Sequence, residues 1–224
     1  MVKDEPATSA PAAELSDEEL EELIRPRAWF LNQRAMGWFL IVTAVIGFYS
    51  SFDLSVEKVK KLEDPGRILS CDFNPFFSCG SVMTHPGAQL FGFPNQFLGI
   101  AAFIFPLLLG VLLVSRTALP SWVMVGLNIG LLGGTALCTF LFIYSIFIIG
   151  VGCPWCIVVW TVTIPLFCVT TGYNTLTGAF GQGLRDSLTA RMFAKHSLEI
   201  GVLWMVVVYG LIVVKFWQFF SNLF

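Results

Sequence analysis

The chain has 224 residues, of which 56% are apolar and only 12% are charged, and its mean hydropathy is +0.76. A soluble domain carries about 25% charged residues, so this composition excludes an ordinary soluble globular protein. The formal net charge is −2 and no basic face is visible, which argues against a protein that binds nucleic acid. We therefore expect an integral membrane protein embedded in a lipid bilayer.

Residues 1–24 form a polar tail that ends in an acidic run. This composition is typical of a solvated, partly disordered arm, and it lacks the basic start and apolar segment of a signal peptide. Arginines follow at positions 25, 27 and 34, and the uncharged run 35–52 is long enough for one membrane span. Basic residues before a first span predict a cytoplasmic tail.

A long loop is expected at 53–94. Its first half is charged, whereas no Asp, Glu, Lys or Arg occurs between Asp72 and Arg116. The uncharged half is too apolar for a free loop and too often interrupted by Pro and Gly for a span. We expect it to fold back over the helices at the membrane surface.

Four more spans are expected at 95–114, 121–149, 154–171 and 198–219, with a polar connection over 172–195. Glycines 126, 130, 133 and 134 recur near one face of the third span, a pattern typical of close helix packing in membranes. The sequence thus predicts an all-α membrane protein with five transmembrane helices.

The distribution of basic residues predicts the orientation. With the N-terminus inside, eight lie in cytoplasmic segments and four in the outer loop: Lys3, Arg25, Arg27, Arg34, Arg116, Arg185, Arg191 and Lys195 against Lys58, Lys60, Lys61 and Arg67. This orientation places Cys71, Cys79, Cys153 and Cys156 on the extracytoplasmic side, where cysteines can form disulfides.

Two cysteine pairs are therefore expected on one side of the membrane. Pro154 suits the first position of a helix, so Cys153 lies at the helix start and Cys156 one turn inside it. The partial positive charge at that helix end favours a thiolate. Cys71 and Cys79 lie eight residues apart in the loop. One fixed pair and one mobile pair predict a two-step thiol–disulfide relay.

The chain resembles the vitamin K epoxide reductase family in its bacterial form, over about residues 35–172. The matching motifs are Cys71-Asp72 with Cys79, then Asn95 at the start of the second span, then Cys153-Pro154-Trp155-Cys156. The resemblance implies a catalytic domain over 25–172, whose four helices form a bundle around a quinone, either menaquinone or ubiquinone. It also implies a bacterial inner-membrane protein, with a cytoplasmic connection and a fifth helix in 173–224.

Many bacterial members continue from the fifth helix into a thioredoxin-like domain. Because this chain stops at Phe224, a separate extracytoplasmic thioredoxin-like protein is the expected partner. By the resemblance, this partner attacks Cys71 of a Cys71–Cys79 disulfide, Cys79 then attacks Cys153, and Cys156 delivers electrons to the quinone. The expected function is reoxidation of the partner, which supports disulfide-bond formation.

The resemblance also implies quinone contacts. Asn95 is expected to donate a hydrogen bond to a quinone oxygen. Trp160 occupies a position where the family often has a tyrosine, and Met83 and Phe91 are further expected contacts. His85 is either a proton donor near the quinone or a surface histidine, and we favour the surface histidine.

Two alternatives stay open. The first is a quinone-epoxide reductase, which Trp160 disfavours because an indole cannot give up a proton as a phenol can. The second is a non-enzymatic membrane protein whose four outer cysteines bind zinc, since four cysteines are a common zinc ligand set. The remaining cysteines, Cys138 and Cys168, are expected to be packing residues inside helices.

Overall fold

The computed structural model describes residues 28–217 and 221. The acidic tail 1–24 and the expected end of the last span at Phe219 lie outside these residues. Five helices in the described part are long and apolar enough to cross a membrane, and no strand longer than an isolated bridge occurs there. The structure therefore confirms the prediction of an all-α protein with five candidate transmembrane helices.

The first long helix extends well beyond its predicted end. A short 3-10 turn, η1 (Trp29–Leu31), precedes α2 (Gln33–Glu63), so the charged first half of the expected loop is helical. The residues after position 52 are mostly good helix formers, and no glycine or proline interrupts them before Pro65. An ion pair of 2.9 Å between Glu57 and Lys60 lies on this extension.

The second and third spans have the predicted bounds. They are α4 (Asn95–Val114) and α5 (Ser121–Ile143), and α5 continues as a π-helical segment, η3 (Tyr144–Ile149). The fourth, α6 (Pro154–Thr177), runs past its expected end at Thr171 to Gly178, whose φ of 79° suits glycine. Two short helices, α7 (Gln182–Asp186) and α8 (Leu188–Lys195), occupy much of the expected polar connection before α9 (Ser197–Lys215).

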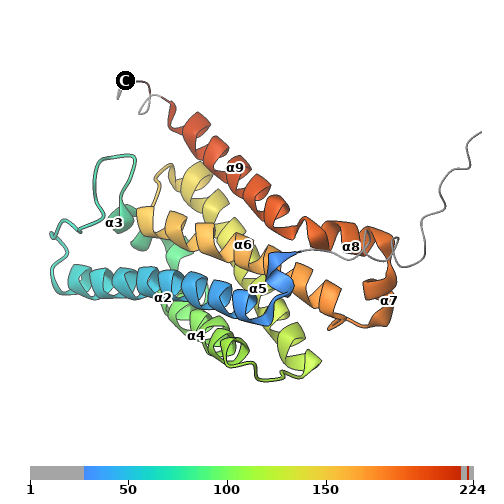
Figure 1. Ribbon diagram of the computed structural model, residues 1–224. Coiled ribbons are helices and arrows are strands. Elements are labelled where there is room, and N and C mark those ends of the chain that lie inside the picture. The colour runs from blue at the N-terminus through green and yellow to red at the C-terminus, as the bar shows by residue number, and fades with distance from the viewer. Residues whose placement is uncertain (1–27, 218–220, 222–224) are drawn as a thin grey trace, which may run out of the picture.

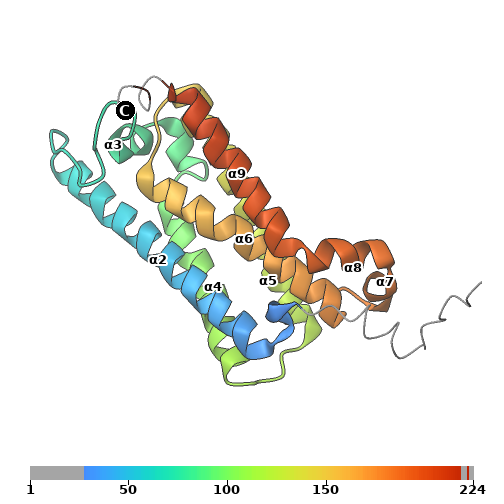
Figure 2. The same ribbon diagram turned by 45° about the horizontal axis from the view of Figure 1, so that its top comes forward.

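Helix α6 lies at the centre of the bundle. It packs against α2, α5, α8 and α9, while α2 makes its most extensive contact with α4. Figures 1 and 2 show α9 running diagonally along the bundle and α7 and α8 at the end remote from α3 (Cys79–Met83). The main core is apolar, and Met36, Leu40, Leu166 and Val169 are fully buried in it.

The close helix packing predicted for the glycines of the third span is not found among the described residues. A Cβ at Gly126, Gly130 or Gly133 would meet no atom within 4 Å, and a Cβ at Gly134 would make only an ordinary contact of 3.9 Å with Thr163 of α6. The close approach occurs instead between α2 and α4, where a Cβ on Gly37 or Gly110 would lie 2.8 Å from the other glycine's carbonyl oxygen. The small-residue seam of this bundle is therefore the α2–α4 contact.

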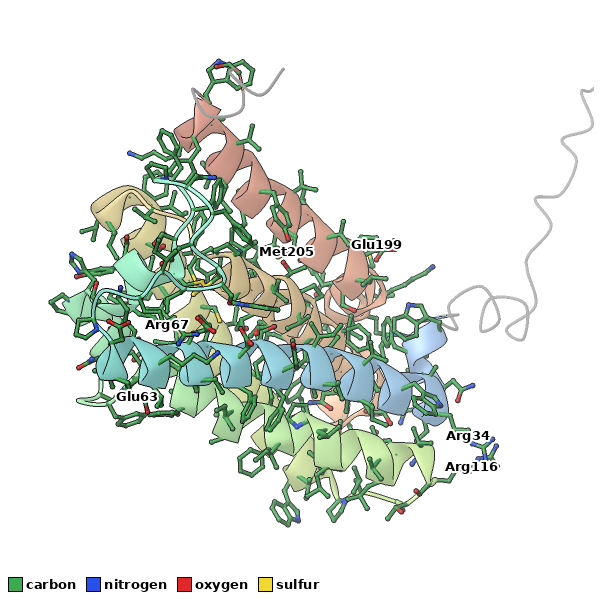
Figure 3. The ribbon with its side chains drawn as sticks, turned by 90° about the vertical axis from the view of Figure 1, so that its left-hand side faces the viewer. Arg34, Glu63, Arg67, Arg116, Glu199 and Met205 are labelled. Carbon is green, nitrogen blue, oxygen red and sulfur yellow. A yellow bond between two sulfur atoms is a disulfide. The ribbon has the colours of Figure 1, made fainter. Side chains whose placement is uncertain are left out.

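Charged side chains lie at both ends of the bundle. Figure 3 shows Arg34 and Arg116 projecting from one end, and Glu63 and Arg67 from the opposite end of α2. The second group belongs to the region that leads into the cysteine-containing loop. The side of the membrane on which each end lies stays a prediction.

Candidate functional site

The loop that follows α2 is organised around a buried disulfide between Cys71 and Cys79. Cys71 is 2% exposed and Cys79 is 0% exposed. Beside it, the Asp72 carboxylate accepts hydrogen bonds from Gly80 N at 2.9 Å and from Ser78 Oγ at 2.8 Å. Leu69 N donates a third bond to the same carboxylate at 3.2 Å.

These hydrogen bonds set the charge of Asp72. Burial by itself raises the pKa of this carboxyl, but the bonds from Gly80, Ser78 and Leu69 outweigh it, so the pKa lies below its ordinary value. Asp72 is therefore an anion that fixes the backbone on both sides of the disulfide. The loop pair, expected to be mobile, is held by these hydrogen bonds in this structure.

A short backbone bridge joins the loop to the second cysteine pair. Gly152 N donates to Phe76 O at 2.8 Å, and Ser78 N donates to Gly152 O at 3.0 Å. Because Cys79 follows Ser78 and Cys153 follows Gly152, the bridge brings the two cysteines side by side. Their sulfur atoms are 3.7 Å apart.

The second pair heads α6 as predicted. Cys153 is the N-cap residue, and its Sγ accepts a hydrogen bond of 3.4 Å from Cys156 N. Both residues are free thiols; Cys153 is 0% exposed, whereas Cys156 is half-buried. This hydrogen bond gives a partner to one backbone N–H in the first turn of α6. It also places the Cys153 sulfur at the partially positive end of the helix, where a negative charge on sulfur is stabilised.

The helical extension of α2 forms hydrogen bonds with the loop and with α3. Lys58 is 7% exposed, and its Nζ donates to Met83 O, at the last residue of α3, at 2.9 Å. Glu57 is also buried and accepts from Ser70 N at 3.3 Å. Because α3 begins with Cys79, these contacts help to hold the disulfide in place.

A pocket with a cavity volume of about 120 Å³ opens beside the cysteines. Its wall is mostly apolar and contains both Cys153 and Cys156. Of the quinone contacts expected from the sequence, Met83, Asn95 and Trp160 line it. Phe91 does not; it is 58% exposed and stacks on Phe93.

The amide side chain of Asn95 is tied to the loop. Its Nδ2 donates to Gly87 O at 2.9 Å, and its Oδ1 accepts from Leu90 N at 3.1 Å. One N–H of the amide is left over for a ligand. Asn95 therefore shapes the pocket wall by holding η2 (Pro86–Gln89) against α4.

The adjacent residue, Gln96, provides the test of whether a quinone fits. Its Nε2 is buried and has no hydrogen-bond partner, and the residue lines the pocket. A buried, unpaired amide donor costs free energy unless a ligand supplies an acceptor. A quinone offers carbonyl oxygens on a flat apolar ring, which matches an apolar pocket with an orphaned donor.

Sequence reasoning missed four polar residues in this wall, Ser51, Gln96, Tyr144 and Ser145. Tyr144 lines the pocket from the start of η3, and its hydroxyl is 2.9 Å from His85 Nδ1. The glutamine next to Asn95 was an available signal, whereas nothing in the sequence distinguishes Tyr144 from the other polar residues of its span. His85 is half-buried and contacts Tyr144, which its placement in the loop did not reveal.

The four cysteines of the two pairs form a disulfide and a neighbouring dithiol. Across residues 28–217 and 221, no group of three or more His, Cys, Asp or Glu side chains is arranged to hold a metal ion. Cys138 and Cys168 are buried within helices, where they pack in an apolar cluster with Trp160 and Met205.

Comparison with known proteins gives one match. The model of the vitamin K epoxide reductase family matches residues 38–171, which is more than half of the chain and contains both cysteine pairs. Searches of curated proteins and of solved structures found no match. Members of this family are membrane oxidoreductases that act on thiols and quinones. The two cysteine pairs, the adjoining pocket and the family match together establish that this chain is an oxidoreductase belonging to the vitamin K epoxide reductase family.

Proposed function

We propose that the protein reoxidises a thioredoxin-like dithiol protein on the extracytoplasmic side of a bacterial inner membrane and passes the electrons to a membrane quinone, menaquinone or ubiquinone. This activity supports disulfide-bond formation outside the cytoplasm. The observation that carries the proposal is the 3.7 Å separation of Cys79 Sγ and Cys153 Sγ, next to the Cys71–Cys79 disulfide. Sulfur atoms at this distance are in position for thiol–disulfide exchange.

The first step is exchange at the loop pair. A thiolate of the reduced partner attacks Cys71, the Cys71–Cys79 bond breaks, and Cys79 leaves as a thiolate. The second thiol of the partner then displaces Cys71, which releases the partner as a disulfide. The partner thereby loses two electrons and two protons, and the loop pair gains the electrons.

The second step moves the electrons to the pair that heads α6. Cys79 attacks Cys153 of a Cys153–Cys156 disulfide, and Cys156 leaves as a thiolate. Cys71 then attacks Cys79 in the crossed disulfide, which restores Cys71–Cys79 and frees Cys153. The product of this step has the oxidised loop pair and reduced Cys153 and Cys156, the same thiol states as in the structure.

The final step takes place in the pocket. A quinone bound there accepts two electrons and two protons. Cys156 lines the pocket and supplies the electrons to the quinone. The free N–H of Asn95 and the unpaired Nε2 of Gln96 donate hydrogen bonds to the quinone oxygens. Met83 and Trp160 complete the apolar wall that excludes water.

The test is quinone reduction by the purified protein with a reduced thioredoxin-like protein as electron donor. The absorbance of the quinone reports turnover, and the variant Cys156→Ala is expected to abolish it. Cys138→Ala is the matched control, because Cys138 is also a buried thiol but does not line the pocket. It is expected to keep the wild-type rate.

Two results would overturn the proposal. One is that wild-type protein reduces neither menaquinone nor ubiquinone with any thioredoxin-like donor. The other is that Cys156→Ala retains donor-dependent turnover, which would place electron transfer elsewhere.

A further inference from the structure

A tyrosine and a histidine meet at the edge of the pocket. Tyr144 lies at the junction of α5 and η3, and His85 lies in the loop just before η2. The Tyr144 hydroxyl is 2.9 Å from His85 Nδ1, although the two residues are 59 positions apart in the chain. Tyr144 lines the pocket, whereas His85 does not and stands behind it.

The surrounding backbone is shaped to this pair. A Cβ at Gly87 would overlap the Tyr144 ring, so η2 packs directly on the face of the tyrosine. Asn95 holds η2 there through its bond to Gly87 O. Below the ring, the helix widens to a π-turn, a distortion that occurs often at functional sites, and ends at Gly150 with a φ of 75°. The tyrosine ring is thus packed against Gly87, and it also stacks on Phe140 with ring centroids 5.7 Å apart.

The hydrogen bond leaves the tyrosine proton available to the pocket. When His85 carries its proton on Nδ1, it donates to the Tyr144 oxygen, and the tyrosine O–H is free to donate to a ligand. The histidine ring is half-buried, so it reaches solvent as well. His85 and Tyr144 therefore form a path from solvent through two exchangeable protons to the pocket.

We propose that Tyr144 is the proton donor for quinone reduction and that His85 reprotonates it from the solvent. The inference rests on the proposed function, because it assigns a proton path to the same pocket. Tyr144 is the catalytic residue of the pair, since it faces the ligand. His85 acts through it.

The dithiol and the quinone exchange equal numbers of electrons and protons. Cys153 and Cys156 lose two electrons and two protons when their disulfide forms, and reduction to a hydroquinone takes up two of each. The electrons leave through the Cys156 sulfur, and the Tyr144 hydroxyl gives its proton to one ring oxygen. His85 Nδ1 then passes its proton to Tyr144 while Nε2 takes up a proton from solvent, so the ring stays neutral. Of the two protons that the dithiol loses, one goes to the second ring oxygen and one to solvent.

The experiment follows a single oxidation of the Cys153–Cys156 dithiol. Protein with reduced Cys153 and Cys156 is mixed with a water-soluble quinone, quenched at intervals and alkylated, so that mass spectrometry counts the remaining thiols. Loss of a general acid costs about 10²–10⁴-fold in rate, so Tyr144→Phe is expected to slow thiol loss at least 100-fold. Quinone affinity, read from quenching of tryptophan fluorescence, is expected to fall by no more than about tenfold, because one hydrogen bond is lost but the ring is retained.

Chemical rescue tests the histidine. His85→Ala is expected to slow thiol loss, and added imidazole to restore it at least tenfold, whereas imidazole does not rescue Tyr144→Phe. Tyr209→Phe is the matched control: its hydroxyl bonds Thr161 Oγ1 at 2.6 Å on the α9 side of α6, outside the pocket. The control is expected to react at the wild-type rate.

The outcomes separate the two proposals. If wild-type dithiol is not oxidised by quinone, the proposed function fails and the proton path fails with it. If wild type is oxidised and Tyr144→Phe matches it, only the proton path is refuted. Failure of imidazole to accelerate His85→Ala, or a loss of quinone binding as large as the loss of rate in Tyr144→Phe, also refutes it.

Discussion

The bridge between Gly152 and the loop makes a sharp prediction about the relay. A Cβ at position 152 would lie 2.8 Å from Cδ1 and Cε1 of the Phe77 ring, whereas ordinary contacts begin at 3.4 Å. Gly152→Ala must therefore move the ring and the backbone apart by about 0.6 Å. The ring does not swing away freely, because it packs against Phe216 with centroids 5.4 Å apart.

The displacement acts directly on the reacting sulfurs. Cys153 follows Gly152 in the chain, and its Sγ is 3.7 Å from that of Cys79. A misplacement of about 1 Å costs roughly 10²-fold in a reaction that depends on alignment, so a shift of this size predicts a loss of about tenfold. Overpacking is expected to cost about 1–3 kcal/mol of stability at the same time.

The assay is the rate at which a reduced donor converts a Cys153–Cys156 disulfide to thiols, followed by quenching and alkylation. Gly152→Ala is expected to react about tenfold more slowly, and Phe77→Leu in the same chain is expected to recover part of the rate by making room. Gly126→Ala is the control, because a Cβ there meets no atom within 4 Å. A wild-type rate in Gly152→Ala would show that the bridge does not align the two pairs.

Three further predictions concern other parts of the site. In Cys71→Ala, a crossed Cys79–Cys153 disulfide is expected to accumulate because the residue that resolves it is gone; peptide mapping that finds Cys79 free would contradict the order of exchange. Gln96→Leu is expected to weaken quinone binding about tenfold, because a hydrogen-bond donor is lost. The melting temperature is expected to stay the same or rise, because an unpaired buried amide is removed. A lower melting temperature with unchanged binding would refute this assignment. The pKa of Asp72 lies below its ordinary value of 3.8, so its stabilisation is complete above that pH and is lost as the pH falls through the lowered pKa. Asp72→Asn is therefore expected to lower the free energy of unfolding at pH 7 by roughly 1–2 kcal/mol, with the difference shrinking below pH 3.8; a difference independent of pH would contradict the role of the charge.

The five spans were predictable because they depend on local composition. The bounds of α4 follow from Pro94 and Asn95 at one end and from Ser115 and Arg116 at the other, and they match the prediction residue for residue. The extension of α2 to Glu63 was missed because charge was taken to end the helix. Charged residues end a membrane span, but glutamate and lysine continue a helix in water.

The parts of the site that were missed depend on contacts between distant residues. The Gly152–Phe76 hydrogen bond, the Lys58–Met83 bond and the Tyr144–His85 bond each join different elements. A sequence gives residue types and spacing, but it does not say which helix faces are brought together. The glycines of α5 illustrate the same limit, because their spacing is suited to close packing and yet no helix packs closely on them.

The burial of the sulfur atoms has a consequence for selectivity among reductants. The two sulfur atoms of the loop disulfide are covered: Cys71 is 2% exposed, Cys79 is 0% exposed, and neither lines the pocket. Under the proposed function, a protein donor that binds the loop uses the free energy of its contacts to displace the cover over Cys71, whereas a small thiol such as glutathione makes no such contacts. We therefore expect the loop disulfide to react faster with a protein dithiol than with small thiols.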